Sequence, residues 1–241
     1  MNLLILNPNS TASMTETIAV AARKSALQST AITAVTGTDP APASVEGHAD
    51  AALAVPPMLA AIRVAERSDT PPSAIIIACF DDPGLLAARE VARAPVLGIA
   101  QSALQVAMLI SARFSIITTL PRSVPVIEDL VQAYGAGHAC RRVRSVDLPV
   151  LALESAHDLA FSRLVAEGRK AIAEDGAEAI ILGCAGMAEM CANLSETLGL
   201  PVIDGVVAAV KLAEALAGGG FATSKAGSLA YPRDKSADKL A

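Results

Sequence analysis

Two cysteines of this 241-residue chain stand at matching places in its two halves. Cys79 directly follows the apolar run 74–78, and Cys184 directly follows the apolar run 179–183. A proline comes 16 residues after Cys79 and 17 residues after Cys184, each time just before another short apolar run. The reference pKa of a thiol is about 8.5, so a thiol serves as acid or base after modest tuning. The matched pair therefore predicts acid–base chemistry by two thiols.

Short apolar runs alternate with longer alanine-rich stretches along the chain, which is typical of α/β folds with parallel sheets. The expected strands are 3–6, 31–35, 74–78, 96–99, 114–118, 144–148, 179–182 and 202–203. The expected helices lie near 13–28, 57–67, 84–93, 101–112, 123–134, 157–174, 187–197 and 206–217. Because neither Pro56 nor Pro57 suits a helix interior, the pair predicts the start of a helix or a kink.

The order strand, cysteine, helix, proline and short strand occurs twice, which indicates an internal duplication. The segment that ends Asn7-Pro8-Asn9-Ser10-Thr11 has a counterpart in the segment that ends Thr118-Thr119. We therefore expect two similar lobes, each with a mostly parallel sheet flanked by helices, related by a pseudo-twofold axis. Ligands bind beyond the carboxyl ends of parallel strands, so both thiols should face one cleft.

The residues after each cysteine are typical of turns and helix starts: Phe80-Asp81-Asp82-Pro83-Gly84 and Ala185-Gly186-Met187. Unpaired backbone amides at such places are expected to favour a thiolate and to bind an oxyanion on a substrate. Gly183 and Gly186 carry no side chain, so the backbone can approach a ligand closely there.

Several polar side chains near the predicted strand ends have two possible roles. Asp81 and Asp82 could form a carboxylate pair, but aspartate also caps helices, and we expect one of the two to do so. The segment 9–11 can cap the first helix and also face the cleft. Thr118 and Thr119 end a strand just before a Leu-Pro pair, so we expect them to face a ligand.

Metal and redox roles for the cysteines are disfavoured. A single buried cysteine is usually a small hydrophobic residue, and we assign Cys140 and Cys191 to packing. The sequence has no C-x-x-C motif, and its three histidines, His48, His138 and His157, are scattered. Zinc sites and thioredoxin-type redox sites depend on such motifs.

Composition excludes other classes of function. A net charge of −5 and an aromatic content of 2% disfavour a nucleic-acid partner, which needs basic and stacking residues. No apolar run reaches the roughly 18 residues of a membrane span, and the first residues lack the basic region of a signal peptide. Four cysteines without a secretion signal suggest reduced thiols, so we expect a cytoplasmic protein.

Three motifs resemble one family: Asn7-Pro8-Asn9-Ser10-Thr11, Ala78-Cys79-Phe80-Asp81-Asp82-Pro83-Gly84-Leu85 and Leu182-Gly183-Cys184-Ala185-Gly186-Met187. They are similar to the hydantoin racemase family of the Asp/Glu racemase superfamily, and the resemblance runs nearly end to end. Within the family, 120–122 and 222–225 look most similar to allantoin racemases. Asp82 and Ala185 stand where related enzymes often carry glycine, and Pro56-Pro57 is also unusual.

The resemblance implies an oligomeric enzyme that moves a proton at C5 of a 5-substituted hydantoin without metal or cofactor, with allantoin favoured. It implies one lobe from 1–99 plus 205–241, a second lobe from 100–204, and an active site between them. Cys79 and Cys184 match the catalytic cysteines of the family. The substrate-binding residues expected are Asn9, Ser10, Ser44, Val45, Phe80, Asp81, Thr118, Thr119, Gly183, Ala185 and Gly186.

Two rival functions stay open. Another two-cysteine isomerase of the superfamily, similar to maleate isomerase, would need cationic groups, and no Lys or Arg adjoins either cysteine. A decarboxylase of the arylmalonate type is expected to keep one cysteine opposite a glycine, which argues against it. The other rival is a catalytically silent protein that binds a small molecule on the same scaffold.

Overall fold

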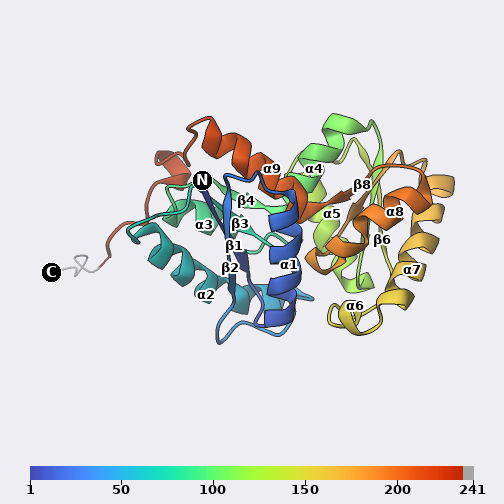
Figure 1. The fold of residues 1–241 in the computed structure, drawn as a ribbon, viewed down its shortest axis with the longest axis horizontal. Helices are drawn as coiled ribbons and strands as arrows, with labels where there is room; N and C mark the ends of the chain where they lie inside the picture. The colour runs from blue at the N-terminus through green and yellow to red at the C-terminus, as the bar shows by residue number, and fades with distance from the viewer. Residues whose placement is uncertain (236–241) are drawn as a thin grey trace.

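A computed structural model describes residues 1–235, and it folds into two lobes that lie side by side (Figure 1). Each lobe contains a four-stranded, fully parallel sheet. The first sheet has the order β2-β1-β3-β4, with β1 Asn2–Asn7, β2 Ala31–Thr36, β3 Ala74–Ile77 and β4 Val96–Gly98. The second has the order β6-β5-β7-β8, with β5 Phe114–Thr118, β6 Cys140–Ser145, β7 Ala179–Leu182 and β8 Val202–Asp204. The predicted α/β class and the two-lobed arrangement are confirmed.

The central strand pairs of the two sheets, β1 with β3 and β5 with β7, correspond residue by residue. Leu6 of β1 pairs with Ile77 of β3, and Ile117 of β5 pairs with Leu182 of β7. One residue further on, the N–H of Ala78 donates to the carbonyl of Leu6 at 2.8 Å, and the N–H of Gly183 donates to the carbonyl of Ile117 at 2.8 Å. The cysteine that follows each of these residues therefore occupies the same position in both sheets.

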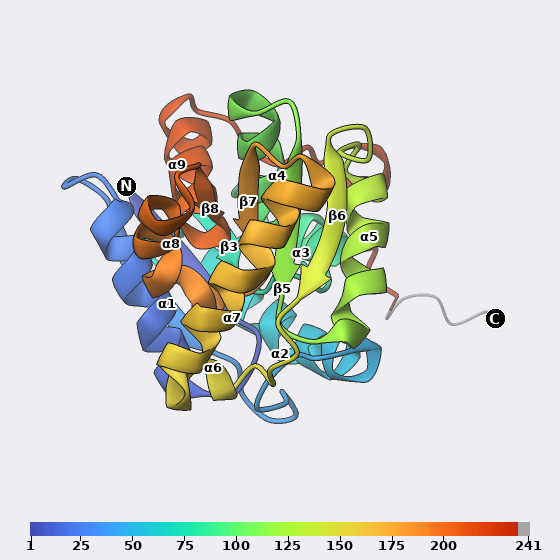
Figure 2. The same ribbon diagram turned by 90° about the vertical axis from the view of Figure 1, so that its right-hand side faces the viewer.

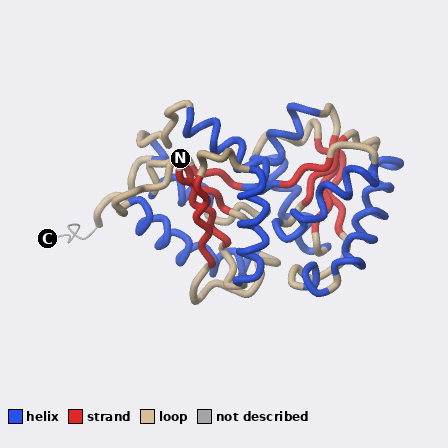
Figure 3. Tube along the Cα trace, viewed as in Figure 1, coloured by secondary structure: helices blue, strands red, loops and turns tan. Residues whose placement is uncertain are grey.

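Helices cover both sheets (Figures 2 and 3). They connect the parallel strands, and their apolar faces pack on the sheets. Their bounds are α1 Ala12–Ser25, α2 His48–Glu66, α3 Leu85–Val91, α4 Ile99–Ile110, α5 Val124–Ala133, α6 Ala152–Ser155, α7 His157–Lys170, α8 Cys191–Leu198 and α9 Gly205–Gly218. Shorter 3₁₀ turns span Pro121–Ser123, Ala185–Met190 and Gly227–Leu229, and a π-helical turn spans Ala171–Asp175. None of the helices in the described part of the chain is both long and apolar enough to cross a membrane.

The C-terminal helix α9 connects the lobes. It follows β8 of the second sheet but packs on β3, α1 and α4, along the upper side of the molecule in Figure 1. One continuous apolar cluster accordingly includes Ile5 of the first sheet, Val210 of α9 and Ile181 of the second sheet. We retain the division into 1–99 plus 205–241 and 100–204 as a proposal, and its last residues, 236–241, lie outside the described residues.

The predicted strand 144–148 is displaced, because the observed strand β6 covers 140–145. Asp147 has a φ of 53°, a left-handed conformation that cannot continue a strand. Arg144, 8% exposed, stays in the sheet because Asp175 accepts hydrogen bonds from its guanidinium, two of them at 2.7 Å. The apolar residues after Ser145 instead form a buried loop beyond the end of the sheet.

Pro56 and Pro57 do not start a helix, contrary to one of the two alternatives, since α2 already begins at His48. The two prolines lack the N–H groups that would bond to the carbonyls of Ala52 and Leu53. Both of these residues are exposed, so water can satisfy the carbonyls that the prolines leave without a partner.

Candidate functional site

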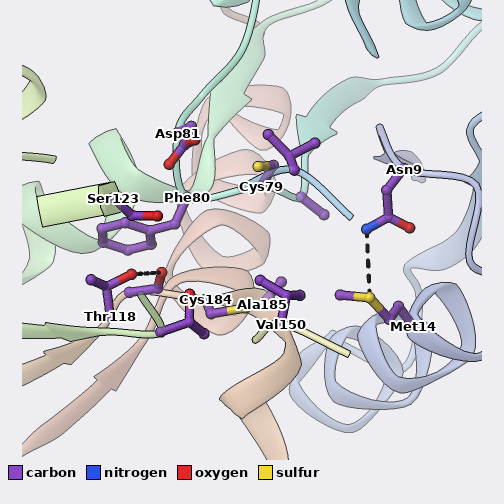
Figure 4. Close-up of a pocket in the computed structure, with 14 residues that line it drawn as sticks. Asn9, Met14, Cys79, Phe80, Asp81, Thr118, Ser123, Val150, Cys184 and Ala185 are labelled. Carbon is purple, nitrogen blue, oxygen red and sulfur yellow. Dashed lines mark hydrogen bonds between the residues drawn. The ribbon is translucent and has the colours of Figure 1, made fainter. Parts of the chain in front are cut away.

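A pocket lies between the lobes, at the carboxyl ends of the central strands of both sheets (Figure 4). It is lined by Asn9, Met14, Val45, Ala78, Cys79, Phe80, Asp81, Thr118, Thr119, Ser123, Val150, Gly183, Cys184 and Ala185. The first seven belong to the segments around the first sheet, and the last seven to those around the second. The duplication thus brings both cysteines to one pocket, one from each lobe.

Burial raises the pKa values of both thiols and so favours their protonated forms. The pKa of Cys79 lies well above its ordinary value, through burial first and then through the negative charge of Asp81 and the nearby thiol of Cys184. Burial, followed by the charges of Asp81, Asp204 and Glu46, raises the pKa of Cys184 to about 12. The backbone N–H groups of Asp81 and Gly186 lower these pKa values and so favour the thiolate, as expected, but their effect is the smaller one. A single backbone N–H beside each sulfur is outweighed by desolvation and by carboxylates.

The backbone around each thiol is nearly the same in both lobes. The N–H of Asp81 stabilises the sulfur of Cys79, and the N–H of Gly186, at the equivalent position, stabilises that of Cys184. Gly183 must be glycine, because a Cβ there would lie 2.9 Å from the Cβ of Thr118. The hydroxyl of Thr118 donates to the carbonyl of Gly183 at 3.1 Å and so ties β5 to the loop that carries Cys184.

The two aspartates after Cys79 have separate roles. Asp82 is the capping residue, but it caps α4 and not the helix that follows it in sequence. Its carboxylate accepts hydrogen bonds from the N–H groups of Ala100 and Gln101, at 3.1 and 2.9 Å, and from the hydroxyl of Tyr134 at 3.0 Å. Asp81 lines the pocket instead, and burial raises the pKa of its carboxyl to about 6.

Most of the residues expected around a substrate come together. Asn9, Val45, Phe80, Asp81, Thr118, Thr119, Gly183 and Ala185 line the same pocket as the two cysteines. Three expected residues do not line it. Ser10 is exposed and donates to the carbonyl of Pro42 at 3.1 Å, whereas Ser44 donates to Glu46 at 3.2 Å. Gly186 lies behind Cys184, where an added Cβ would be 3.7 Å from the sulfur.

Four lining residues were missed by the sequence reasoning: Met14, Ala78, Ser123 and Val150. Ala78 directly precedes Cys79, so the strand end itself could have revealed it. Met14 is one turn into α1, where the side-chain amide of Asn9 donates to its sulfur at 3.6 Å. Ser123 and Val150 line the pocket because the tertiary fold brings their segments to it, and no local sequence pattern predicts this.

The loop 37–47 of the first lobe closes against the second lobe. Oε1 of Glu46 accepts a hydrogen bond from the N–H of Val150 at 3.0 Å, and the neighbouring Val45 lines the pocket. A second link joins the hydroxyl of Ser13 to Glu154 at 2.8 Å. These contacts hold the two walls of the pocket together.

Replacing Glu46 tests this closure. We expect Glu46→Ala to lower the free energy of unfolding by about 1–2 kcal/mol, because the buried N–H of Val150 loses its acceptor. Glu46→Gln retains an acceptor oxygen and should lose less than half as much. Urea unfolding of the three proteins measures the difference. Equal losses in both variants would show that the charge, and not the hydrogen bond, stabilises the loop.

The lining of the pocket is suited to proton transfer on an uncharged ligand. Two thiols are close enough to influence each other's ionisation, and no Lys or Arg is among the lining residues. Within residues 1–235, no three His, Cys, Asp or Glu side chains come together in a way that could hold a metal ion. Two thiols in one pocket can act as acid and base on a bound ligand.

Comparisons with known proteins agree on one family. The family model described as Asp/Glu/Hydantoin racemase matches residues 3–213. A hydantoin racemase of Rhizobium meliloti is 59% identical over 239 residues, which cover 98% of this chain and 97% of that protein. The solved allantoin racemase from Klebsiella pneumoniae superposes with a TM-score of 0.93 at 45% identity, over 98% of this chain and 95% of that one. The allantoin racemase from Pseudomonas fluorescens gives a TM-score of 0.93 at 38% identity, over 98% of both chains.

Proposed function

The chain belongs to the Asp/Glu/Hydantoin racemase family, and we propose that it interconverts the enantiomers of 5-substituted hydantoins, with allantoin as the preferred substrate. The observation that carries the proposal is the pocket in which Cys79 and Cys184 take equivalent positions from the two lobes. A two-base racemisation needs a proton donor and a proton acceptor on opposite faces of one carbon, and a duplicated thiol supplies both.

In the proposed reaction, the ring lies between the two cysteines with the C5–H bond directed at one sulfur. One thiol first loses its proton to solvent water. The resulting thiolate takes the C5 proton, and the electron pair of the C–H bond passes to the adjacent carbonyl as an enolate. Backbone N–H groups of the turns 80–81 and 185–186 hold the enolate oxygen, and those of Asp81 and Gly186 turn to it from the sulfur once that sulfur carries a proton. The opposite thiol then donates its proton to the other face of C5, which leaves one thiol and one thiolate again.

The raised pKa values of both thiols have a consequence for this reaction. A thiolate formed in such a site is a strong base, so it is better matched to a weakly acidic C–H bond than an ordinary thiolate. The carbonyl next to C5 acidifies that bond, so an electron-sink cofactor is not required for the chemistry.

Two further observations support hydantoins, and allantoin among them, as substrates. The relatives named as hydantoin or allantoin racemases match nearly the whole chain. The pocket combines apolar residues with the amide of Asn9, the carboxylate of Asp81 and the hydroxyls of Thr118, Thr119 and Ser123, which suits a small polar ring. A cytoplasmic location and a homo-oligomeric state remain part of the proposal.

Polarimetry with single enantiomers tests the function. We expect the optical rotation of pure allantoin to decay to zero with the purified protein and no added metal or cofactor. Decay should be slower with 5-benzylhydantoin and 5-isopropylhydantoin. Binding without decay, and without exchange of the C5 hydrogen in deuterated water, would instead identify a silent binding protein. Turnover of a dicarboxylate but not of any hydantoin would identify another isomerase.

A further inference from the structure

The carboxylate of Asp81 has acceptor capacity that the protein does not use. Within residues 1–235, no N–H or O–H group donates a hydrogen bond to it, whereas its neighbour Asp82 accepts three. Asp81 is partly buried in the pocket wall beside Cys79 (Figure 4). A carboxylate that is removed from bulk water without donors is unfavourable, so a ligand that brings donors would stabilise it.

The internal duplication supplies this carboxylate in one lobe only. Gly186 occupies the position equivalent to Asp81, two residues after the second cysteine, and it has no side chain. A group that takes part in the proton transfer itself would be expected on both faces of the substrate. A group that recognises one substituent is needed on one side only, and Asp81 fits this second description.

The charges around Asp81 define the ligand group that it can accept. The exposed His48 influences the ionisation of Asp81, and Asp81 influences that of Cys79 and Cys184. Asp82 is next to Asp81 in sequence, and Glu46 is near Cys184. Apart from the exposed His48, none of these groups carries positive charge. An anionic substituent would be repelled, and an alkyl substituent would leave the carboxylate without donors. An uncharged substituent with N–H groups provides hydrogen-bond donors for the carboxylate of Asp81.

We propose that Asp81 is the residue that selects a ureido substituent at C5, by accepting its two N–H groups on the two carboxylate oxygens. This inference rests on the proposed function. The two N–H bonds of an open-chain ureido group are parallel and match the spacing of a carboxylate, as in other bidentate pairs. The two N–H bonds of the hydantoin ring point apart, so one carboxylate cannot bind both. Asp81 therefore distinguishes allantoin from hydantoins with apolar substituents.

The test compares two substrates in three proteins. In Asp81→Val, kcat/KM for allantoin should fall by about 10- to 100-fold, because both hydrogen bonds are lost. For 5-isopropylhydantoin it should stay the same or rise, because the unpaired carboxylate is gone. Asp81→Asn, which is nearly isosteric, should show a smaller change in the same direction. Asp82→Asn is the matched control, since its side chain caps α4 outside the pocket, and the ratio of the two substrates should not change.

A pH profile adds a readout that a merely structural role would not affect. The carboxyl of Asp81, with a pKa of about 6, must be ionised to accept two N–H groups. As the pH falls below about 6, KM for allantoin should rise in the wild-type protein and not in Asp81→Asn. KM for 5-isopropylhydantoin should show no such rise in either protein.

The outcomes separate this inference from the proposed function. A parallel loss of kcat/KM for both substrates in Asp81→Val, or an unchanged substrate ratio, overturns the role of Asp81 while racemisation itself stands. Failure of the wild-type protein to racemise either substrate overturns the function as well. Circular dichroism of each variant shows whether a loss of activity reflects misfolding, and Asp81→Asn provides the readout if Asp81→Val does not fold.

Discussion

Replacement of either Cys79 or Cys184 by serine is expected to lower the rate of racemisation by about 10³-fold or more, since in the proposed mechanism each substitution removes the acid or the base on one face of C5. A serine hydroxyl is a much weaker acid than a thiol, so it neither forms the anion nor releases a proton readily. The side chains are nearly isosteric, and both positions are in the wall of the pocket. The fold should therefore be retained.

Each single variant should keep one half of the reaction. The remaining sulfur can still remove the C5 proton of the enantiomer that faces it and can return a deuteron from deuterated water to the same face. NMR should detect this exchange for one enantiomer in Cys79→Ser and for the other enantiomer in Cys184→Ser. Cys191→Ser is the matched control, because that sulfur is outside the pocket and donates to the carbonyl of Val202. Near-normal racemisation in either pocket variant would contradict the mechanism.

Gly98→Ala is expected to destabilise the protein by about 3 kcal/mol, because the new methyl group collides with the cap of α4. A Cβ on Gly98 would overlap the carboxyl group of Asp82. The collision would displace this buried carboxylate from the N–H groups of Ala100 and Gln101. The expected fall in Tm is roughly 6–12 °C for a chain of this size.

A double-mutant cycle identifies the cause of this loss. In an Asp82→Ala background the carboxylate is absent, so adding Gly98→Ala should change the free energy of unfolding by less than about 1 kcal/mol. Urea unfolding of the four proteins measures the coupling. Additive losses would mean that Gly98 is required for a reason other than the space that Asp82 occupies.

In the second lobe, the helix after the fourth strand, α9, is capped by a carboxylate from a different position. By sheet register Asp204 is the counterpart of Gly98, since β3 aligns Ile77 with Gly98 and β7 aligns Leu182 with Asp204. Asp204 caps α9 from this position by accepting the N–H of Val207 at 2.8 Å. Each lobe thus places one carboxylate at the start of the helix after its fourth strand. The residue that supplies it differs, which explains why a glycine is required in one lobe only.

Much of the fold and of the site could be predicted because it depends on local pattern. Short apolar runs between helical stretches define parallel strands, and parallel strands place the residues that follow them at one edge of a sheet. The repeated strand and cysteine were therefore enough to predict two lobes with both thiols in one pocket, together with positions such as Asn9 and Thr118. Errors in local detail arose where long-range contacts prevail, as at β6, where Arg144 is held by Asp175.

By itself, the sequence determined the class of fold, its duplication and the matching positions of Cys79 and Cys184 in the two halves, because each of these follows from the type and spacing of nearby residues. The tertiary structure decided the direction in which the pKa values of the thiols shift. It also decided that Asp82 caps α4 whereas Asp81 lines the pocket. Those properties depend on burial and on charges from other segments, such as Glu46 beside Cys184 and the start of α4 beside Asp82. Electrostatic energy is set by distances through space, and residues that are far apart in the chain fix those distances only once it has folded.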